Sequence, residues 1–404
     1  MKILLISENF YPESNAPGKR LFEHAKEWIR LGNEVTVLTG VPNAPKGKVF
    51  EGYKNRIYQS EKIDGIKIVR IWTFIAKNER FLLRTLDFIS FMITSFFFGL
   101  FIKKHDKIIV SSPQFLPVIS GFIIAKIKNI PFILEIRDLW PESIVALGAI
   151  NKNNYIIKIL YAIAKYIYRK SELIVVVTKT FKEYLVDMGI KEDKIIVIEN
   201  GFNFDSTLKP NKSIQAIKEK YNITNKNFTV SYIGTIGMSH GIEIVLEAAQ
   251  LIKDVNFLII GEGAQKKSLQ KIVKVKKITN ILFIDNIDWQ EIVNINQIIS
   301  VNLIHLRNLE LFKTVIPSKI FESMALRKPI LAGLIGESLD IIIQSRSGLE
   351  VVPENPDSLV EKILQMKNNQ NLCDELASNG FKLVQERYNR KILAGKMIDR
   401  ISSL

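Results

Sequence analysis

Short apolar runs alternate with longer amphipathic segments along the first half of the chain. Apolar runs of this kind are typical of strands buried on both faces, and apolar residues spaced three or four apart are typical of helices. The alternation therefore predicts βαβ units around a parallel sheet. The predicted strands of this half cover residues 2–7, 34–38, 66–71, 107–110, 132–135, 173–177 and 194–198, and a helix is predicted over 21–31.

The second half repeats the same alternation. Its predicted strands cover residues 229–233, 257–260, 281–284, 301–304 and 330–332, and helices are predicted over 241–253, 317–326 and 356–368. The predicted fold class is therefore α/β, with two Rossmann-like, doubly wound domains in series. Such sheets bind ligands at the carboxyl ends of their strands, so we expect the two domains to face a central cleft.

The length of 404 residues exceeds what one ordinary core fills, which agrees with two domains. Asn200-Gly201 interrupts the pattern, and a polar, lysine-rich stretch over 203–226 reads as a hinge region. We predict domains over 1–202 and 203–385, with a C-terminal helix over 386–404 that crosses back to the first domain.

Composition narrows the class of protein. The single cysteine, Cys373, and four scattered histidines have no metal-ligand spacing, so we expect neither a bound metal nor a disulfide framework. The net charge of +15 would suit nucleic acid, an anionic membrane or a phosphorylated substrate, although a lysine-rich proteome would also produce it. Because no recognised motif supports it, nucleic-acid binding is the least expected of these. The first residues resemble a strand, not a signal peptide, so the cytoplasm is the expected location.

One segment is unusually apolar for a soluble domain. Residues 88–102 contain no charge, and basic residues lie on both sides of them. A helix near 81–104 could lie in a membrane interface, pack in the core, or span a membrane, although it is shorter than most spanning helices. Anionic lipid would attract the basic flanks, which favours the interface. The predicted membrane residues are Phe88, Phe91, Phe96, Phe97, Phe98 and Phe101.

The stretch from Val315 to Leu331 carries candidate chemistry. Pro317 suits the first turn of a helix, whose free N–H groups attract phosphate, and Lys319 would add a cation there. Glu322 lies one turn later on the same side, and its oxygens could hold sugar hydroxyls. The pair would suit a ligand with a diphosphate and a ribose, although a plain surface ion pair is an equally simple interpretation.

Glycines follow two predicted strands of the second domain. Gly234 ends one strand, and His240 and Gly241 precede the next helix; Gly261, Glu262 and Gly263 form a turn after another strand. Small residues at these points would let backbone N–H groups approach an anion or leave room for a flat base. In the first domain no GxGxxG follows the first strand, which argues against a nicotinamide dehydrogenase.

Four charged residues cluster near a predicted strand end in the first domain: Glu135, Arg137, Asp138 and Glu142. Charges beside a buried strand are costly unless they are paired or functional. Both interpretations remain open from the sequence.

These residues together resemble the retaining glycosyltransferases of family GT4, which have the GT-B fold, and more narrowly the WbuB-type enzymes of O-antigen and capsule assembly. The resemblance covers nearly the whole chain. It is strongest over residues 10–54, 133–143, 198–202, 261–263 and 316–331.

The resemblance implies roles for particular residues. The loop over 13–18, with Glu13, Asn15, Ala16 and Gly18, would face the donor diphosphate or the acceptor. Ser318 and Lys319 would contact the diphosphate, and Gly261 to Gly263 would lie beside the uracil. Glu322 matches the second glutamate of the family's E-x7-E motif, which holds the ribose. Arg137 and Asp138 fall where many relatives carry a histidine–aspartate pair near the reacting sugar.

The chain departs from the family pattern at two points. Thr314 occupies the position of the first glutamate of the E-x7-E motif, and Glu310 is out of register with it. Thr235 and His240 fall near positions where relatives carry arginine and lysine. A 6-deoxy or N-acetylated donor sugar, such as FucNAc, would need fewer carboxylate contacts.

The implied function is a hexosyltransferase that moves a sugar from a UDP-sugar, with retention, to a saccharide on undecaprenyl diphosphate, without a metal or other cofactor. Catalytic roles would fall to Asp138, Arg137, Glu322 and Lys319, and acceptor contacts to Glu13, Glu135, Asp138 and Glu142. The enzyme would be peripheral or monotopic on the cytoplasmic face of the cell membrane, against anionic lipid. A GT-B nucleotide-sugar 2-epimerase and a nucleotide-binding membrane scaffold without transfer activity are the alternatives.

Overall fold

The computed structural model describes residues 1–13, 15–44, 47–75, 81–112, 115–142, 154–223 and 228–404. The chain divides into two compact units: unit 1 is Met1–Glu199 with Arg390–Leu404, and unit 2 is Asn200–Asn389. The predicted boundaries after 202 and 385 both fall inside unit 2. Phe202 pairs with Asn389 in a β-bridge, and a helix continues to Glu386, so both ends of this segment stay with unit 2.

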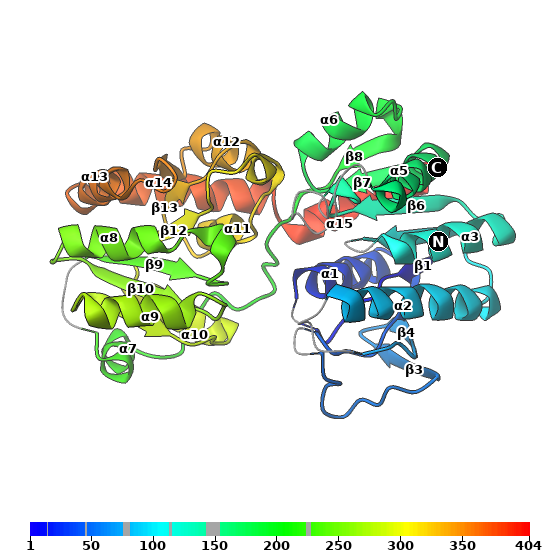
Figure 1. Ribbon diagram of the computed structural model, residues 1–404, viewed down its shortest axis with the longest axis horizontal. Coiled ribbons are helices and arrows are strands. Elements are labelled where there is room, and N and C mark those ends of the chain that lie inside the picture. Colours follow the sequence, from blue (N-terminus) through cyan, green and yellow to red (C-terminus); the bar gives the residue numbers. More distant parts are fainter. Residues whose placement is uncertain (14, 45–46, 76–80, 113–114, 143–153, 224–227) are drawn as a thin grey trace. The chain divides into compact units, whose positions relative to one another are not determined.

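Unit 1 is built on a parallel sheet (Figure 1). Its strands are β1 (Lys2–Ile6), β2 (Glu34–Thr39), β3 (Tyr58–Ile63), β4 (Ile66–Ile71), β5 (Lys107–Ser111), β6 (Phe132–Ile136), β7 (Leu173–Val176) and β8 (Ile195–Val197). Its helices are α1 (Ala16–Arg30), α2 (Phe81–Phe101), α3 (Leu116–Lys128), α5 (Tyr155–Lys170), α6 (Lys179–Asp187), the short η1 (Glu192–Lys194) and α15 (Arg390–Ser402). The strand order is β3-β4-β2-β1-β5-β6-β7-β8, and β3 alone of these is antiparallel to its neighbour.

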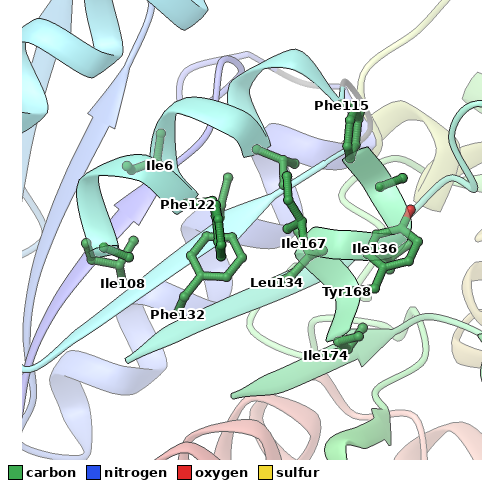
Figure 2. Close-up of a cluster of buried hydrophobic side chains, with 14 of the residues drawn as sticks. Ile6, Ile108, Phe115, Phe122, Phe132, Leu134, Ile136, Ile167, Tyr168 and Ile174 are labelled. Carbon is green, nitrogen blue, oxygen red and sulfur yellow. The ribbon is translucent and has the colours of Figure 1, made fainter. Parts of the chain in front are cut away.

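Alternate residues of the unit 1 strands enter two different cores. Ile3 and Leu5 of β1 pack with α1 and α15, whereas Leu4 and Ile6 pack with α2, α3, α5 and α6. Successive side chains of a strand point to opposite faces, so both faces of the sheet must be covered by helices. Figure 2 shows the second core, where Phe122 of α3 meets Phe132 of β6 edge to face. These packed helices fix the carboxyl ends of the strands.

Unit 2 is a second parallel sheet, with strand order β11-β10-β9-β12-β13-β14. The strands are β9 (Thr229–Ile233), β10 (Asn256–Ile260), β11 (Ile281–Ile284), β12 (Val301–His305), β13 (Ile330–Gly333) and β14 (Gly348–Glu350). The helices are α7 (Ile214–Tyr221), η2 (Met238–His240), α8 (Glu243–Leu251), α9 (Lys266–Val275), α10 (Trp289–Ile295), η3 (Asn296–Ile298), η4 (Glu310–Thr314), α11 (Lys319–Ala325), α12 (Glu337–Gln344), α13 (Pro356–Lys367) and α14 (Gln370–Glu386). The predicted pair of α/β domains is confirmed.

Several element boundaries differ from the predictions. Helix α1 begins at Ala16, before the predicted start at 21, because the Asn15 side chain accepts a hydrogen bond from Gly18 N at 2.8 Å and Pro17 suits the first turn. Helix α7 occupies part of the predicted hinge. The edge strand β3 was missed because its residues are mostly polar and exposed.

Helix α11 begins at Lys319, two residues after Pro317, and is only seven residues long. The N–H groups of Ile320 and Phe321 already donate to the carbonyls of Pro317 and Ser318. The helix therefore presents fewer unpaired N–H groups to an anion than the sequence suggested, and a helix this short has a weak dipole.

The apolar segment forms helix α2, of which Leu83–Phe101 is long and apolar enough to cross a membrane by length and composition. Phe91 is wholly buried, and Phe96 and Phe98 pack against the core. Of the six predicted membrane residues, Phe97 and Phe101 are the exposed ones, and Phe88 is half-buried. The prediction that all six contact a membrane is therefore wrong for Phe91, because one face of α2 belongs to the core.

Candidate functional site

Two glycine-containing turns lie side by side at the carboxyl ends of β9 and β10. Gly234 N donates to Ile260 O at 2.8 Å, and Ile236 N donates to Glu262 O at 2.8 Å. A Cβ on Gly261 would stand 2.0 Å from Gly234 O, and one on Gly263 would stand 2.2 Å from Ile236 O. Both residues also have positive φ, so these positions require glycine and bring two backbones into contact.

The side chain of Lys319, the first residue of α11, lies against Gly234 of the first turn. Its Nζ donates to the Tyr232 hydroxyl at 2.7 Å and lies 4.1 Å from the centre of the Tyr232 ring. A Cβ on Gly234 would stand 2.3 Å from Lys319 Cε, so glycine is needed for the lysine to pass. Burial lowers the pKa of Lys319 to about 8. In the described part of the chain, no ion pair within 4 Å joins it to Glu322, so the interpretation as a plain surface ion pair is wrong.

Glu322 lines a small pocket of about 20 Å³ in unit 2. The pocket is also lined by Trp289, Lys319 and Ser323 and by Asn302 of β12. Asn302 is held by Ser231 and Ser323 in a buried chain of hydrogen bonds. A carboxylate, an ammonium and an indole thus line one small pocket, and Lys319 links this pocket to Gly234.

His240 is the other candidate cation near Lys319. Its ring meets Tyr232 edge to face, with ring centres 6.1 Å apart, and its Nδ1 has no hydrogen-bond partner among the described residues. Burial, followed by the charge of Lys319, lowers the pKa of His240 to about 4. His240 is therefore neutral near pH 7 and can offer one N–H or one lone pair, but not a charge.

A buried lysine that the sequence analysis missed anchors the Gly-Glu-Gly turn. Lys266, at the start of α9, donates to Gly261 O at 2.9 Å and pairs with Glu262 at 2.7 Å and Asp285 at 2.5 Å. Glu262 is therefore engaged with Lys266, although its own side chain is 57% exposed. Tyr232 was missed as well, because nothing in the sequence marks a strand tyrosine as the partner of a lysine 87 residues away.

The segment before α11 has fewer side chains available to a ligand than the sequence suggested. Thr314 Oγ1 donates to Leu311 O in its own turn, and Glu310 is exposed and paired with Lys313 at 2.7 Å. Pro317 and Ser318 are half-buried where α11 begins, and Gly241 packs against His305 with positive φ. Glu310 therefore does not replace the missing first glutamate.

In unit 1, the loop after β1 is held together by its own polar side chains. Asn15 caps α1 through Gly18, whereas Glu13 accepts from the N–H groups of Asn43 and Ala44 at 2.8 Å each. Ala16 begins α1, and Ser14 of the predicted loop over 13–18 lies outside the described residues. These side chains shape the loop, and the Glu13 carboxylate is largely occupied in doing so.

Glu135 is wholly buried, so it is not placed to meet an acceptor. Its oxygens accept from Arg20 Nε at 3.1 Å and from Ser111 Oγ at 2.6 Å. Arg20 in turn donates to the carbonyls of Ile198 and Glu199. The predicted acceptor contact of Glu135 is corrected: the residue fixes α1 to β6 from the inside.

Arg137 lies at the carboxyl end of β6, beyond this buried pair. Among the described residues, its Nε and Nη1 atoms have no hydrogen-bond partner, and burial lowers its pKa to about 10. A buried guanidinium with unused N–H groups is costly, which marks it as a candidate ligand contact. Asp138 and Glu142 follow it, both half-buried and both engaged in further interactions.

Two carboxyl groups that the sequence did not single out, those of Glu8 and Asp87, are influenced by the charge of Glu13. Burial raises the pKa of Glu8 well above its usual value and raises that of Asp87 to about 7, and each is raised further by nearby carboxylates. One oxygen of each is buried without a partner among the described residues. A carboxyl group that holds its proton can both donate to a hydroxyl and accept from it.

Comparisons with known proteins agree with this arrangement of two units. The glycosyltransferase family 4 model matches residues 18–206, and the model for glycosyl transferases group 1 matches residues 213–383. The putative colanic acid biosynthesis glycosyl transferase WcaI of Escherichia coli K12 is 25% identical, over 70% of this chain and 71% of its own. The capsular polysaccharide biosynthesis glycosyltransferase CapM of Staphylococcus aureus is 22% identical, over 73% and 76%.

A solved structure has the same fold over the whole chain. Anabaena HepE in complex with UDP-glucose superimposes with a TM-score of 0.70 and 16% identity, covering 100% of both chains. The family 4 model covers most of unit 1, and the group 1 model lies within unit 2. The chain therefore belongs to the family 4 glycosyltransferases and has the GT-B fold.

Proposed function

We propose that the protein transfers a sugar from a UDP-sugar, with retention of configuration, to a saccharide carried on a lipid diphosphate during capsule or O-antigen synthesis. The observation that carries this proposal is the buried ammonium of Lys319, which crosses Gly234 beside Glu322 and the paired glycine turns. HepE, with the same fold, binds UDP-glucose, and WcaI and CapM are named for polysaccharide synthesis.

The donor would be held in unit 2. The diphosphate would meet Lys319, with His240 as a neutral hydrogen-bond donor, at the edge where β9 and β10 end. The hydroxyls of the ribose would bond to Glu322, and the uracil would lie beside the turn that Lys266 holds in place. A short α11 leaves most of the charge stabilisation to the ammonium itself.

The chemistry requires the bond between the sugar and the diphosphate to break as positive charge develops on the sugar. Glycosidases meet such charge with two carboxylates, whereas here the departing diphosphate oxygen can take the proton of the acceptor hydroxyl. Lys319 stabilises the negative charge that grows on the diphosphate. Removing one such preorganised group typically costs about 3–4 kcal/mol of transition-state stabilisation. The proposal uses no metal ion.

The acceptor would be held in unit 1. Arg137 offers unused N–H groups, and Glu8 and Asp87 each offer one buried carboxyl oxygen that has no partner among the described residues. Asp138 follows Arg137 and would lie beside the acceptor hydroxyl. A lipid diphosphate carrier, such as undecaprenyl diphosphate, would place the reaction on the cytoplasmic face of the cell membrane.

The composition of the segment before α11 supports an N-acetylated or 6-deoxy donor sugar. Its only carboxylate, Glu310, is paired with Lys313, whereas Leu309, Leu311 and Val315 are exposed by 52%, 37% and 37%. Apolar side chains in this place would suit the methyl group of an N-acetylated or 6-deoxy sugar. The comparisons name glycosyltransferases and do not favour the 2-epimerase alternative.

The proposal is tested with the variants Lys319→Ala and Glu322→Ala. We expect each to lower turnover by at least about 100-fold, since each removes a contact that the reaction uses. The measurement is product mass after incubating each UDP-sugar of a panel with a lipid-linked GlcNAc acceptor. Lys313→Ala is the matched control, because Lys313 is an exposed lysine of the same segment whose partner is Glu310.

Full activity in both folded variants would refute the assignment. UDP binding without any product, with every donor of the panel, would favour the scaffold alternative. Conversion of the free UDP-sugar in the absence of lipid would favour the epimerase.

A further inference from the structure

Helix α2 presents one stripe of apolar side chains to solvent. Leu86, Ile93, Phe97 and Phe101 are exposed by 49%, 46%, 56% and 85%. Their spacings of seven, four and four residues place them on one face of the helix. The opposite face, with Phe91 and Ser95, is buried. The stripe is therefore a surface that the fold leaves uncovered, not the edge of a core.

Helices α3 and α5 continue this surface. Helix α3 packs along α2, and its Phe122 meets Tyr166 of α5 edge to face at 5.9 Å, so the three helices form one layer over the sheet. Large apolar side chains on the outside of α3 and α5 are exposed by 40% to 77%: Ile123, Ile127, Tyr155, Ile156, Ile159 and Tyr166. We call the exposed apolar residues of α2, α3 and α5 the docking face.

The other side of the same sheet is different. Helices α1 and α15 cover it, and among the described residues of these helices and their ends the large, apolar and exposed ones are Leu31, Ile392 and Leu404. Exposed apolar residues scattered singly are ordinary, but a contiguous group over three helices marks an interaction surface. Ile57, Tyr58 and Trp72, in and beside β3 and β4, are exposed as well. Of the two helix layers of unit 1, the one with α2, α3 and α5 thus has the larger exposed apolar surface.

Charge indicates the kind of partner. Helices α2, α3 and α5 contain seven basic residues, Arg84, Lys126, Lys128, Lys158, Lys165, Arg169 and Lys170, and a single acidic residue, Asp87. Asp87 is half-buried, and its raised pKa reduces its charge further. Helices α1 and α15 contain eight basic and three acidic residues, and Arg20, Arg30 and Arg390 among them are paired with carboxylates. A second copy of the same face would bring like charges together, whereas anionic lipid complements both the apolar stripe and the cations.

The attachment of α2 to unit 1 opposes a spanning arrangement. Ser95 Oγ lies 2.7 Å from Ser120 Oγ of α3, and a Cβ on Gly99 would stand 2.5 Å from Ile124 Cδ1. To cross a bilayer, α2 would have to leave this close packing and expose the buried ring of Phe91. A helix held in this way can lie in the interface with only its outer stripe inserted.

We propose that the docking face binds an anionic lipid bilayer, with α2, α3 and α5 lying together along its surface. The partner is the lipid headgroup and acyl boundary, which takes the apolar side chains while phosphates meet the lysines. The inference rests on unit 1 alone and does not depend on the proposed transfer reaction.

The test is co-sedimentation of the full chain with vesicles of phosphatidylcholine containing 30% phosphatidylglycerol, and with pure phosphatidylcholine. The variant Phe97→Ser/Phe101→Ser/Ile127→Ser removes exposed residues only, so unit 1 should still fold. Its matched control, Leu31→Ser/Ile392→Ser, removes exposed apolar residues from the other side. A second variant, Lys126→Glu/Lys158→Glu/Arg169→Glu, changes charge alone, with Lys396→Glu on α15 as its control.

We expect the serine variant and the charge variant each to reduce the bound fraction on anionic vesicles about tenfold or more, with both controls unchanged. Pure phosphatidylcholine should bind the protein more weakly than the mixed vesicles. Unchanged sedimentation of the serine variant would overturn the proposal. The proposal would also be overturned if light scattering showed that the serine variant had lost self-association while it still bound vesicles. That result would assign the docking face to a second copy of the chain.

The UDP affinity of the same variants tests the proposed donor site independently of vesicle binding. The docking-face variants should bind UDP like the unmodified chain. Normal vesicle binding with no UDP binding would overturn the proposed function and leave the docking face intact.

Discussion

At the residue scale, the environment of Lys319 decides what the candidate donor site can do. Its ammonium is buried against Tyr232, and the one hydrogen bond and ring contact it makes there do not offset the loss of water, so the pKa falls to about 8. The charge of Glu322 offsets this loss only in part. A diphosphate bound close to Lys319 would therefore be stabilised by the ammonium and would raise its pKa.

The titration of Lys319 predicts how UDP affinity depends on pH. Below pH 8 the lysine is charged in the unliganded protein, and affinity should be level. A bound diphosphate raises the pKa of Lys319, so above pH 8 binding must take up a proton. Affinity should then fall with rising pH, by up to about tenfold per pH unit. Isothermal titration at pH 7, 8 and 9, in buffers of different ionisation enthalpy, measures both effects.

Lys319→Arg is the control for this prediction, because a guanidinium stays charged over the whole range. Its UDP affinity should not vary between pH 8 and 9. A wild-type affinity that is constant to pH 9 with no proton uptake would show that Lys319 does not meet the diphosphate.

At the scale of elements, a buried glutamate joins α7 and the segment before it to α10. Glu291 accepts from Lys212 at 2.8 Å, Lys220 at 2.5 Å and Tyr221 at 2.8 Å, and these bonds lower its pKa to about 2 despite burial. The polar stretch that the sequence presented as a hinge is therefore fastened to unit 2 by side chains.

The bonds of Glu291 to Lys212, Lys220 and Tyr221, here called the clasp, predict that the attachment of α7 is sensitive to acid. A carboxyl group whose pKa is lowered on folding stabilises the fold above its unfolded pKa, near 4.5, and loses that contribution as the pH falls towards 2. Glu291→Gln should lower the protection of α7 amides in hydrogen exchange at pH 7, and the difference from wild type should shrink below pH 4.5. Glu219→Gln, on the exposed side of α7, is the control. Equal protection of α7 in both variants at pH 7 would contradict the role of the clasp.

At the scale of the whole molecule, the chain ends by returning to unit 1. Helix α15 buries Leu393, Ala394, Met397, Ile398 and Ile401 beside α1, and the Trp28 indole donates to Ala394 O at 3.0 Å. Burying each large apolar side chain contributes about 1.5–3 kcal/mol. Their sum is comparable with the stability of a typical domain, about 5–15 kcal/mol.

Removal of residues 390–404 should therefore unfold unit 1 and leave unit 2 intact. Limited proteolysis with mass readout measures the two units separately. Cleavage should spread through residues 1–199, while 200–389 should persist as a fragment. The full-length variant Lys396→Ala, changed at an exposed position of α15, should resist cleavage like the wild type. Equal resistance of unit 1 after truncation would show that its core is complete without α15.

Much of the fold followed from the sequence because its cause is local. Strands such as β1 and β5 are buried on both faces over Ile3–Ile6 and Ile108–Val110 and are apolar there, so the pattern predicted them. Edge strand β3 and helix α7 are polar and were missed. In the candidate site, Gly234, Gly261 and Lys319 were predicted from their positions at strand ends and a helix start, whereas Tyr232 and Lys266 were not.

The sequence by itself determined two α/β units, the strand ends at which the candidate donor site lies, and the apolar character of residues 88–102, since each depends on neighbours along the chain. The tertiary structure decided which groups meet. It placed Lys319 on Tyr232, buried Glu135 against Arg20 115 residues away, and turned Phe91 inward and Phe101 outward. Such contacts join segments distant in the sequence, so they exist only once the helices have packed and fixed which side of each residue faces water.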